Sequence, residues 1–172
     1  MRRVLVIGSG GSGKTTLARR LADRTGIPVI HLDSYFWRPG WEATPPDQWK
    51  ATVQDLLARD AWIMDGNYGG TLESRLLACD TVVFLDLPRL VCLRRVLIRR
   101  LGSLRRDRPE LPAGCPERLS WEFLVWIWTY PVRRRGAILR RLAELGKEKR
   151  VIILRSPAEV EAFLAGKTPD AA

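Results

Sequence analysis

The sequence predicts an α/β fold in which helices cover both faces of a five-stranded parallel sheet. Two observations support this prediction. Short apolar runs rich in Val, Ile and Leu alternate along the 172 residues with longer segments of helical periodicity. The first run leads into a glycine-rich turn that opens a helix, an arrangement that directs backbone N–H groups at a bound anion. In such folds, ligands bind beyond the carboxyl ends of the strands.

The five strands are expected at residues 2–7, 27–32, 61–64, 81–85 and 151–154. The helices are expected at 14–25, 47–59, 72–78, 89–101, 118–130, from 131 to about 146, and 158–164. Asp47 is the expected N-cap of the second helix, and Pro131 is expected to kink or break the helical run around it. Residues 34–46 contain four aromatic residues and three prolines, which favours an ordered aromatic loop.

Residues 8–15, Gly-Ser-Gly-Gly-Ser-Gly-Lys-Thr, match the phosphate-binding loop pattern G-x-x-x-x-G-K-[ST] at every fixed position. Glycines let the backbone approach phosphate oxygens closely. We expect Lys14 to reach the β- and γ-phosphates and to take part in catalysis, and the Thr15 hydroxyl to ligate Mg²⁺. The predicted ATP site comprises Gly8, Ser9, Gly10, Gly11, Ser12, Gly13, Lys14, Thr15 and Thr16. The fold class is therefore predicted to be the three-layer P-loop NTPase fold.

Polar residues follow three predicted strands at the edge that carries this loop. Asp33 could be a general base that accepts the proton of an acceptor hydroxyl, a residue that helps to hold Mg²⁺, or a loop cap. Asp86 is a candidate for holding Mg²⁺. Asp65 and Asn67 could contact the acceptor or form a turn, and Arg75 could bind an acceptor phosphate.

The net charge of +10 arises between residues 89 and 141, where fourteen arginines face four acidic residues. One interpretation is a helical, arginine-rich lid over ATP at about 102–135, because phosphoryl transfer depends on positioned positive charge. The other is a nucleic-acid-binding surface. We favour the lid, because no helix-turn-helix, zinc finger or aromatic platform for single strands accompanies the arginines. Nucleic acid remains an alternative partner.

Three widely spaced cysteines fit neither a disulfide framework nor a metal site, which favours a reducing compartment. The first strand follows the initial methionine so closely that no signal peptide is expected, and the longest apolar stretch is too short to span a membrane. We therefore expect a cytoplasmic protein without a membrane partner, and the sequence leaves its oligomeric state open. His31 and the aromatic helix at 118–130 are expected to serve packing, the helix in the core or at an oligomer interface.

Four segments carry a resemblance to a known family: the loop at 8–15, His-Leu-Asp at 31–33, Asp-Gly-Asn-Tyr at 65–68, and the arginine-rich stretch after Leu-Asp-Leu-Pro at 85–88. On these motifs the chain resembles the nucleoside-monophosphate-kinase-like branch of P-loop proteins, which includes adenylate and shikimate kinases. Within that branch it is most similar to the bacterial DNA topology modulation protein family, which is related to adenylate kinase. The resemblance implies one kinase-like domain over residues 1–172.

The resemblance to adenylate kinases extends to the spacing of arginines after Pro88, which here selects Arg95, Arg99 and Arg100. It implies that Arg95 stacks on adenine and that Arg99 contacts the transferring phosphates. The adenylate kinase motif Gly-Phe-Pro-Arg is replaced by Gly-Asn-Tyr-Gly at 66–69, which argues against AMP as the acceptor.

The sequence therefore predicts a Mg²⁺-dependent ATP kinase whose acceptor is a nucleotide, a nucleoside or another small molecule with a hydroxyl or phosphate group. The alternative prediction is an ATPase-type switch or a nucleic-acid-associated regulator of DNA topology.

Overall fold

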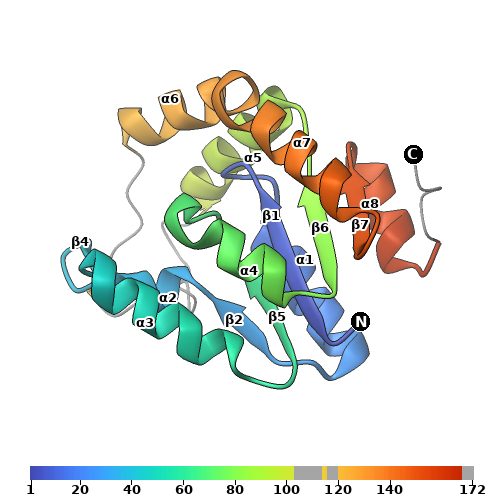
Figure 1. Ribbon diagram of the computed structural model, residues 1–172. Coiled ribbons are helices and arrows are strands. Elements are labelled where there is room, and N and C mark those ends of the chain that lie inside the picture. Colours follow the sequence, from blue (N-terminus) through green and yellow to red (C-terminus); the bar gives the residue numbers. More distant parts are fainter. Residues whose placement is uncertain (103–113, 116–119, 168–172) are drawn as a thin grey trace.

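A parallel five-stranded sheet forms the centre of the molecule (Figure 1). The computed structural model describes residues 1–102, 114–115 and 120–167. Across the sheet the strands are β2 (Val29–His31), β5 (Trp62–Asp65), β1 (Arg3–Gly8), β6 (Thr81–Leu85) and β7 (Arg150–Leu154). Every pairing in this sheet is parallel. The predicted sheet is confirmed, and its strand bounds differ from prediction by one or two residues at most ends.

Helices connect the strands and cover the sheet. In chain order they are α1 (Lys14–Thr25), α2 (Asp33–Phe36), α3 (Pro46–Leu57), the 3₁₀ turn η1 (Gly69–Thr71), α4 (Leu72–Ala78), α5 (Arg89–Gly102), α6 (Trp121–Tyr130), the π-helical segment η3 (Pro131–Arg135), α7 (Gly136–Leu145) and α8 (Pro157–Leu164). None of the described helices combines the length and apolar character needed to cross a membrane.

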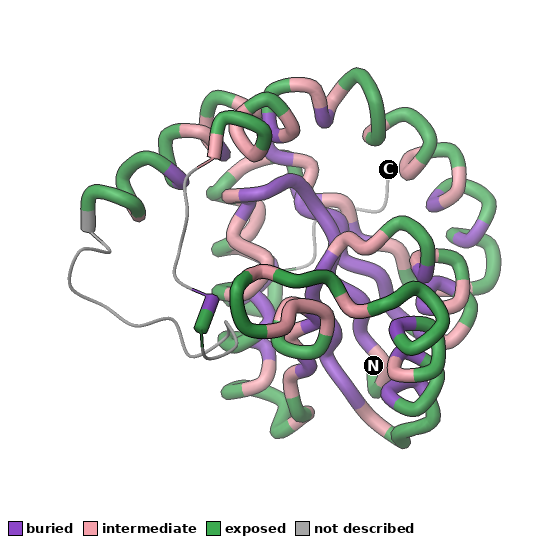
Figure 2. Tube along the Cα trace, turned by 90° about the vertical axis from the view of Figure 1, so that its left-hand side faces the viewer, coloured by how far each residue is buried: buried purple, intermediate pink, exposed green. Residues whose placement is uncertain are grey.

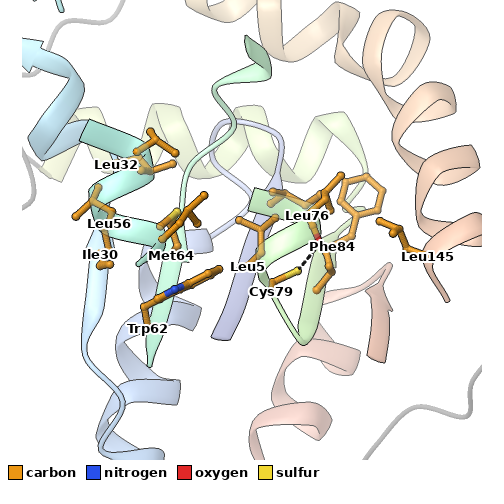
Figure 3. Packing of buried hydrophobic residues seen from close by; sticks show 14 of the residues in the cluster. Leu5, Ile30, Leu32, Leu56, Trp62, Met64, Leu76, Cys79, Phe84 and Leu145 are labelled. Atoms are coloured by element: carbon orange, nitrogen blue, oxygen red, sulfur yellow. Dashed lines mark hydrogen bonds between the residues drawn. The ribbon is translucent and has the colours of Figure 1, made fainter. Parts of the chain in front are cut away.

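Alternating side chains along the strands build two cores, one on each face of the sheet. Val4 and Val6 pack with the apolar face of α1 and with α8. Leu5 and Ile7 pack on the other face with α3, α4 and α7. Figure 3 shows this second core, with Phe84 of β6 among the side chains that fill it. The strands are buried while the outer surfaces of the helices are exposed, as Figure 2 shows. The three-layer prediction is therefore confirmed.

Helix α6 was expected in the core or at an oligomer interface, and within this chain it is only partly buried. It packs against α5 through Ile127, which lies with Cys92 and Val96 in a third, smaller core. On its outer side Trp121 is 74% exposed, and Trp128 lies under the guanidinium of Arg89 at 3.9 Å. Pro131 does not end the helical run, because η3 carries it on into α7.

The segment between β2 and α3 is more regular than the predicted loop. After α2 it forms a small antiparallel hairpin of β3 (Trp37–Arg38) and β4 (Glu42–Ala43). Gly114 and Cys115 lie against this hairpin: the Gly114 carbonyl accepts from the N–H of Gly40 at 3.0 Å, and the Cys115 thiol donates to the carbonyl of Arg38 at 3.0 Å. The hairpin is therefore anchored to a segment far along the chain.

Two further expectations change. Helix α3 begins at Pro46, so Pro45 is its N-cap and Asp47 lies inside its first turn. Proline suits the first turn because its missing N–H has no intrahelical partner there. Much of the predicted lid at 102–135, namely residues 103–113 and 116–119, lies outside the described residues.

Candidate active site

The phosphate loop lies where β1 runs into α1, as the sequence predicts. The N-terminus of α1 has no side-chain cap, because its N-cap is Gly13. Its first backbone N–H groups therefore remain for an anion. Gly11 has a φ of 74°, and a Cβ atom there would lie 2.4 Å from the carbonyl oxygen of Cys92 in α5. Only glycine allows α5 to approach the loop so closely.

Lys14 folds back over the loop that precedes it. Its Nζ donates hydrogen bonds to the carbonyl oxygens of Gly8 at 3.1 Å and Ser9 at 2.9 Å. Burial lowers the pKa of Lys14, and the negative charges of Asp65 and Asp33 oppose that shift. Both carboxylates are therefore close enough to interact with the ammonium group. The phosphate loop and the two acids belong to one electrostatic site.

Asn67 ties the loop after β5 to the phosphate loop. Its Nδ2 donates to the Gly8 carbonyl at 2.7 Å, and its Oδ1 accepts from the Gly8 N–H at 3.3 Å. The next residue, Tyr68, donates its hydroxyl to Asp33 Oδ1 at 2.5 Å. Burial, followed by the charge of Asp33, raises the pKa of Tyr68, so its hydroxyl stays protonated as a donor. Asp33 is thereby held in one orientation.

Asp65 is the last residue of β5, and His31 of the neighbouring strand β2 lies opposite it in the sheet. Asp65 Oδ1 lies 3.0 Å from His31 Nδ1. The carboxyl group is 5% exposed, and its Oδ2 has no hydrogen-bond partner among the described residues. Leaving a buried carboxylate oxygen unpaired costs free energy, which a bound cation or water would recover. His31 was expected to be a packing residue, and its contact with Asp65 gives it a more specific role.

Arg75 requires a correction, because it cannot reach an acceptor. It is fully buried, and its guanidinium donates to the carbonyl oxygens of Gly66 at 2.8 Å and Thr71 at 3.2 Å. The same group also donates to the carbonyls of Asn67 at 2.7 Å and Tyr68 at 2.8 Å. Burial lowers the pKa of Arg75 to about 10, so it remains charged at neutral pH. Arg75 supports the 66–71 loop from beneath.

Asp86 is also placed differently from the expectation that it holds Mg²⁺. Both of its carboxylate oxygens accept hydrogen bonds from Arg135, Oδ1 from Nε at 2.7 Å and Oδ2 from NH2 at 2.9 Å. Its side chain is nearly buried in this pair, and it does not line the cavity beside the phosphate loop. Asp86 thus fixes the π-helical segment η3, between α6 and α7, against the end of β6.

Helices α5 and α6 complete the surroundings of the phosphate loop. Arg95 donates from NH1 to the Ser12 carbonyl at 2.9 Å, and Arg99 lines the same cavity one turn further along α5. Phe123 of α6 packs against Gly10, because a Cβ atom on Gly10 would lie only 2.7 Å from the Phe123 ring. Phe123 stacks on Trp126 with ring centroids 6.1 Å apart. Two of the three arginines that the resemblance selected, Arg95 and Arg99, therefore lie at the phosphate loop.

These residues surround one cavity of about 940 Å³. Among the predicted site residues it brings together Gly10, Gly11, Ser12, Gly13, Lys14, Thr15, Thr16, Asp33, Asp65, Asn67, Arg95 and Arg99. Gly8, Ser9, Arg75 and Asp86 do not line it. The cavity wall also has an aromatic part that was not predicted from the sequence. It is formed by Trp37, Trp41, Tyr68, Phe123 and Trp126. The concentration of aromatic residues at 34–46 was the available sign.

Kinases are among the proteins that are similar to this chain, although no protein-family model matches it. The uncharacterized protein YqaC of Bacillus subtilis (strain 168) is 29% identical over 133 residues, which cover 75% of this chain and 72% of that protein. Shikimate kinase of Rhodococcus erythropolis is 26% identical over 182 residues, covering 98% of both. Cytidylate kinase of Nitratidesulfovibrio vulgaris is 37% identical over 76 residues, covering 43% of this chain; the match spans only 33% of the cytidylate kinase.

Solved structures agree on the fold. Shikimate kinase from Acinetobacter baumannii, in complex with shikimate, superposes with a TM-score of 0.58 at 19% identity, covering 97% of this chain and 90% of that one. Shikimate kinase from Bacteroides thetaiotaomicron gives a TM-score of 0.53 at 16% identity, covering 96% and 95%. The chain has the P-loop kinase fold of the shikimate kinases. The predicted nucleoside-monophosphate-kinase-like fold is thereby confirmed.

The placement of Arg75 generates a prediction about stability. Arg75→Met should lower the free energy of unfolding by about 3 kcal/mol or more, because four backbone carbonyls each lose a charged donor. Urea denaturation followed by circular dichroism measures this change. The matched control is Arg59→Met, since Arg59 is exposed at the end of α3. Equal effects of the two substitutions would contradict the supporting role of Arg75.

Proposed function

We propose that this protein is an ATP-dependent, Mg²⁺-using kinase that transfers the γ-phosphoryl group to a hydroxyl of a small molecule. One observation carries the proposal: the phosphate loop with Lys14 opens into the same cavity as Asp33, whose carboxylate is oriented by Tyr68. Shikimate and cytidylate kinases among the relatives support phosphoryl transfer as the reaction. The ATPase-type switch has no comparable structural support, because it would not need an oriented carboxylate in the cavity.

ATP would bind with its phosphates in the loop at 8–15. The free N–H groups at the start of α1 and the positive end of the helix dipole favour anions there. Lys14 would exchange its bonds to two loop carbonyls for bonds to phosphate oxygens. Arg95 and Arg99 would flank the nucleotide from α5 and stabilise the charge that develops on the transferring group.

The residues present fit a Mg²⁺ ion bound together with ATP. The Thr15 hydroxyl lies on the first turn of α1 and lines the cavity, and the unpartnered Oδ2 of Asp65 supplies a hard oxygen ligand, directly or through water. Bound there, Mg²⁺ would neutralise charge on the β- and γ-phosphates. We therefore assign the acidic part of the metal site to Asp65 instead of Asp86, which Arg135 occupies.

Asp33 would act as the general base. A hydroxyl that donates to Asp33 Oδ2 is held with its oxygen facing the γ-phosphate, and its proton can pass to the carboxylate as the new bond forms. Asp33 Oδ1 already accepts from Tyr68, so the carboxylate cannot rotate freely. Asn67 holds the neighbouring loop against Gly8 and thereby fixes the distance between base and phosphate loop.

We further propose that residues 1–172 form one kinase-like domain in the cytoplasm, with a lid at about residues 102–135. The motifs at 8–15, 31–33, 65–68 and 85–88 support membership of the DNA topology modulation protein family within the P-loop kinase fold.

The proposed reaction is tested by screening small alcohols, nucleosides and nucleoside monophosphates for ATP-dependent phosphorylation, with mass spectrometry to detect the product. Lys14→Ala should abolish transfer, because the positive charge at the phosphates is lost while no core contact is removed. Lys50→Ala, an exposed position on α3, is the control and should behave as wild type. Transfer at the wild-type rate by Lys14→Ala would refute the assignment of the phosphate loop. Slow ATP hydrolysis with no acceptor phosphorylated would favour the switch.

The role of Asp33 generates a separate prediction. Asp33→Asn should lower kcat by about 10²–10⁴, the usual contribution of a general base, while the KM for ATP barely changes. Steady-state kinetics with any acceptor found in the screen measures both constants. Asp47→Asn, an exposed carboxylate in the first turn of α3, serves as the control. A large loss of ATP affinity would instead place Asp33 in the metal site, and an unchanged kcat would remove it from the reaction.

A further inference from the structure

The cavity that contains Asp33 is walled in part by aromatic rings. Trp37 and Trp41 of the β3–β4 hairpin form an edge-to-face pair with centroids 5.3 Å apart. Phe123 and Trp126 of α6 form a nearly parallel pair, with 9° between their planes. All four rings are half-buried and line the same cavity as Tyr68. Partly exposed rings that face one cavity from two different elements are suited to contact a flat ligand.

Two of the aromatic residues that line this cavity have a strained backbone conformation. Within the described part of the chain, the non-glycine residues with positive φ are Trp41, at 66°, and Tyr68, at 22°. Such a conformation in a bulky residue costs about 1–3 kcal/mol and persists where the surrounding structure enforces it, often at ligand sites. The bond from the Trp41 N–H to the Arg38 carbonyl and the bond from Arg75 to the Tyr68 carbonyl enforce it here. Both strained residues present aromatic rings to the cavity.

The cationic side chains that line the cavity come from only some of its elements. Among the described residues, the cations that line it lie on the phosphate loop and on helices α1 and α5: Lys14, Arg19, Arg20, Arg95 and Arg99. The hairpin and the loop after β5 contribute rings and an amide. The arginines nearest to them in the chain are used elsewhere, since Arg38 donates to Gln48 and Arg75 to backbone carbonyls. Within the described part of the chain, an acidic group on the acceptor would therefore face Asp33 without a compensating cation from these elements.

We infer that the acceptor is an uncharged alcohol that carries a flat aromatic or heteroaromatic ring, the chemistry of a nucleoside. The inference rests on the proposed kinase function. The ring would lie between the Trp37–Trp41 pair and the Phe123–Trp126 pair, with its hydroxyl directed at Asp33. That hydroxyl oxygen forms the new bond to the γ-phosphorus of ATP, the bond from this phosphorus to the β,γ-bridging oxygen breaks, and ADP leaves with the electron pair. The proton passes to Asp33.

The relatives define the discriminating alternatives. A cytidylate kinase acts on a nucleoside monophosphate, and shikimate is a carboxylate on a non-aromatic ring. A second cavity, of about 420 Å³, shares Trp126 with the first and is lined by Arg133 and Arg134, so an acceptor phosphate could reach those cations instead. Acceptors that differ by one chemical feature therefore separate the three possibilities.

The experiment measures kcat/KM for cytidine, cytidine 5′-monophosphate, shikimate and benzyl alcohol at saturating ATP, with adenosine and thymidine to extend the base set. We expect a nucleoside to exceed cytidine monophosphate and shikimate by at least about 100-fold, since an uncompensated charge beside a carboxylate is strongly disfavoured. Benzyl alcohol at the level of the nucleosides would support the ring chemistry and broaden the class to aromatic alcohols. Preference for cytidine monophosphate or shikimate would overturn the inference and leave the kinase function intact.

A variant tests the aromatic wall itself. Trp41→Leu should raise the KM for the nucleoside about tenfold, the scale of one stacking contact, while the KM for ATP stays unchanged. Trp128→Leu is the matched control, because Trp128 is a partly exposed tryptophan of α6 that does not line the cavity. Calorimetric titration of cytidine into the protein with bound ADP gives a readout independent of turnover. Retained ATP binding without cytidine binding would overturn the inference, whereas absent ATP binding would overturn the proposed function.

Discussion

The candidate site depends on the double hydrogen bond between Asn67 and Gly8. This amide pairs with both polar groups of the residue at which β1 becomes the phosphate loop. Arg75 holds the 66–71 loop from beneath through four backbone carbonyls. Tyr68, which follows Asn67 in the chain, orients Asp33 by donating its hydroxyl to Asp33 Oδ1. A buried cation thus fixes a loop, and that loop fixes both the phosphate-binding backbone and the carboxylate that faces it. Few rotatable bonds separate the two halves of the proposed reaction centre.

The same arrangement brings positively and negatively charged side chains together around one cavity. Lys14, Arg95 and Arg99 gather at the phosphate loop, where ATP would bring negative charge, while Asp33 and Asp65 lie where a metal ion and a hydroxyl would be needed. Phosphoryl transfer requires mainly such positioning and electrostatic stabilisation. Aromatic rings from the β3–β4 hairpin and from α6 form the remaining wall. The fold of the shikimate kinases is thus combined here with aromatic residues that line the cavity.

Local patterns in the sequence were sufficient to predict the sheet, the phosphate loop and the acids at the strand ends. Apolar runs report burial directly, and the loop motif at 8–15 is specific. Roles set by distant contacts could not be predicted. Asp86 pairs with Arg135, 49 residues away, and Arg75 is recognisable as a loop support only once four carbonyls surround it. The hairpin after α2 has strands of two residues each, too short for a periodic pattern, and Phe123 and Trp126 resemble core residues in sequence although they line the cavity.

The central claim is that ATP and Mg²⁺ occupy the cavity between Lys14 and Asp33. A crystal structure of the protein with a non-hydrolysable ATP analogue and Mg²⁺ tests it most directly. We expect residues 8–15 to surround the phosphates and the metal to lie near Thr15 and Asp65. Lys14 Nζ should have exchanged the carbonyls of Gly8 and Ser9 for the phosphates. The terminal phosphate should then face Asp33. A nucleotide bound elsewhere, or Lys14 still bonded to its own loop with the analogue present, would show that this cavity is not the ATP site.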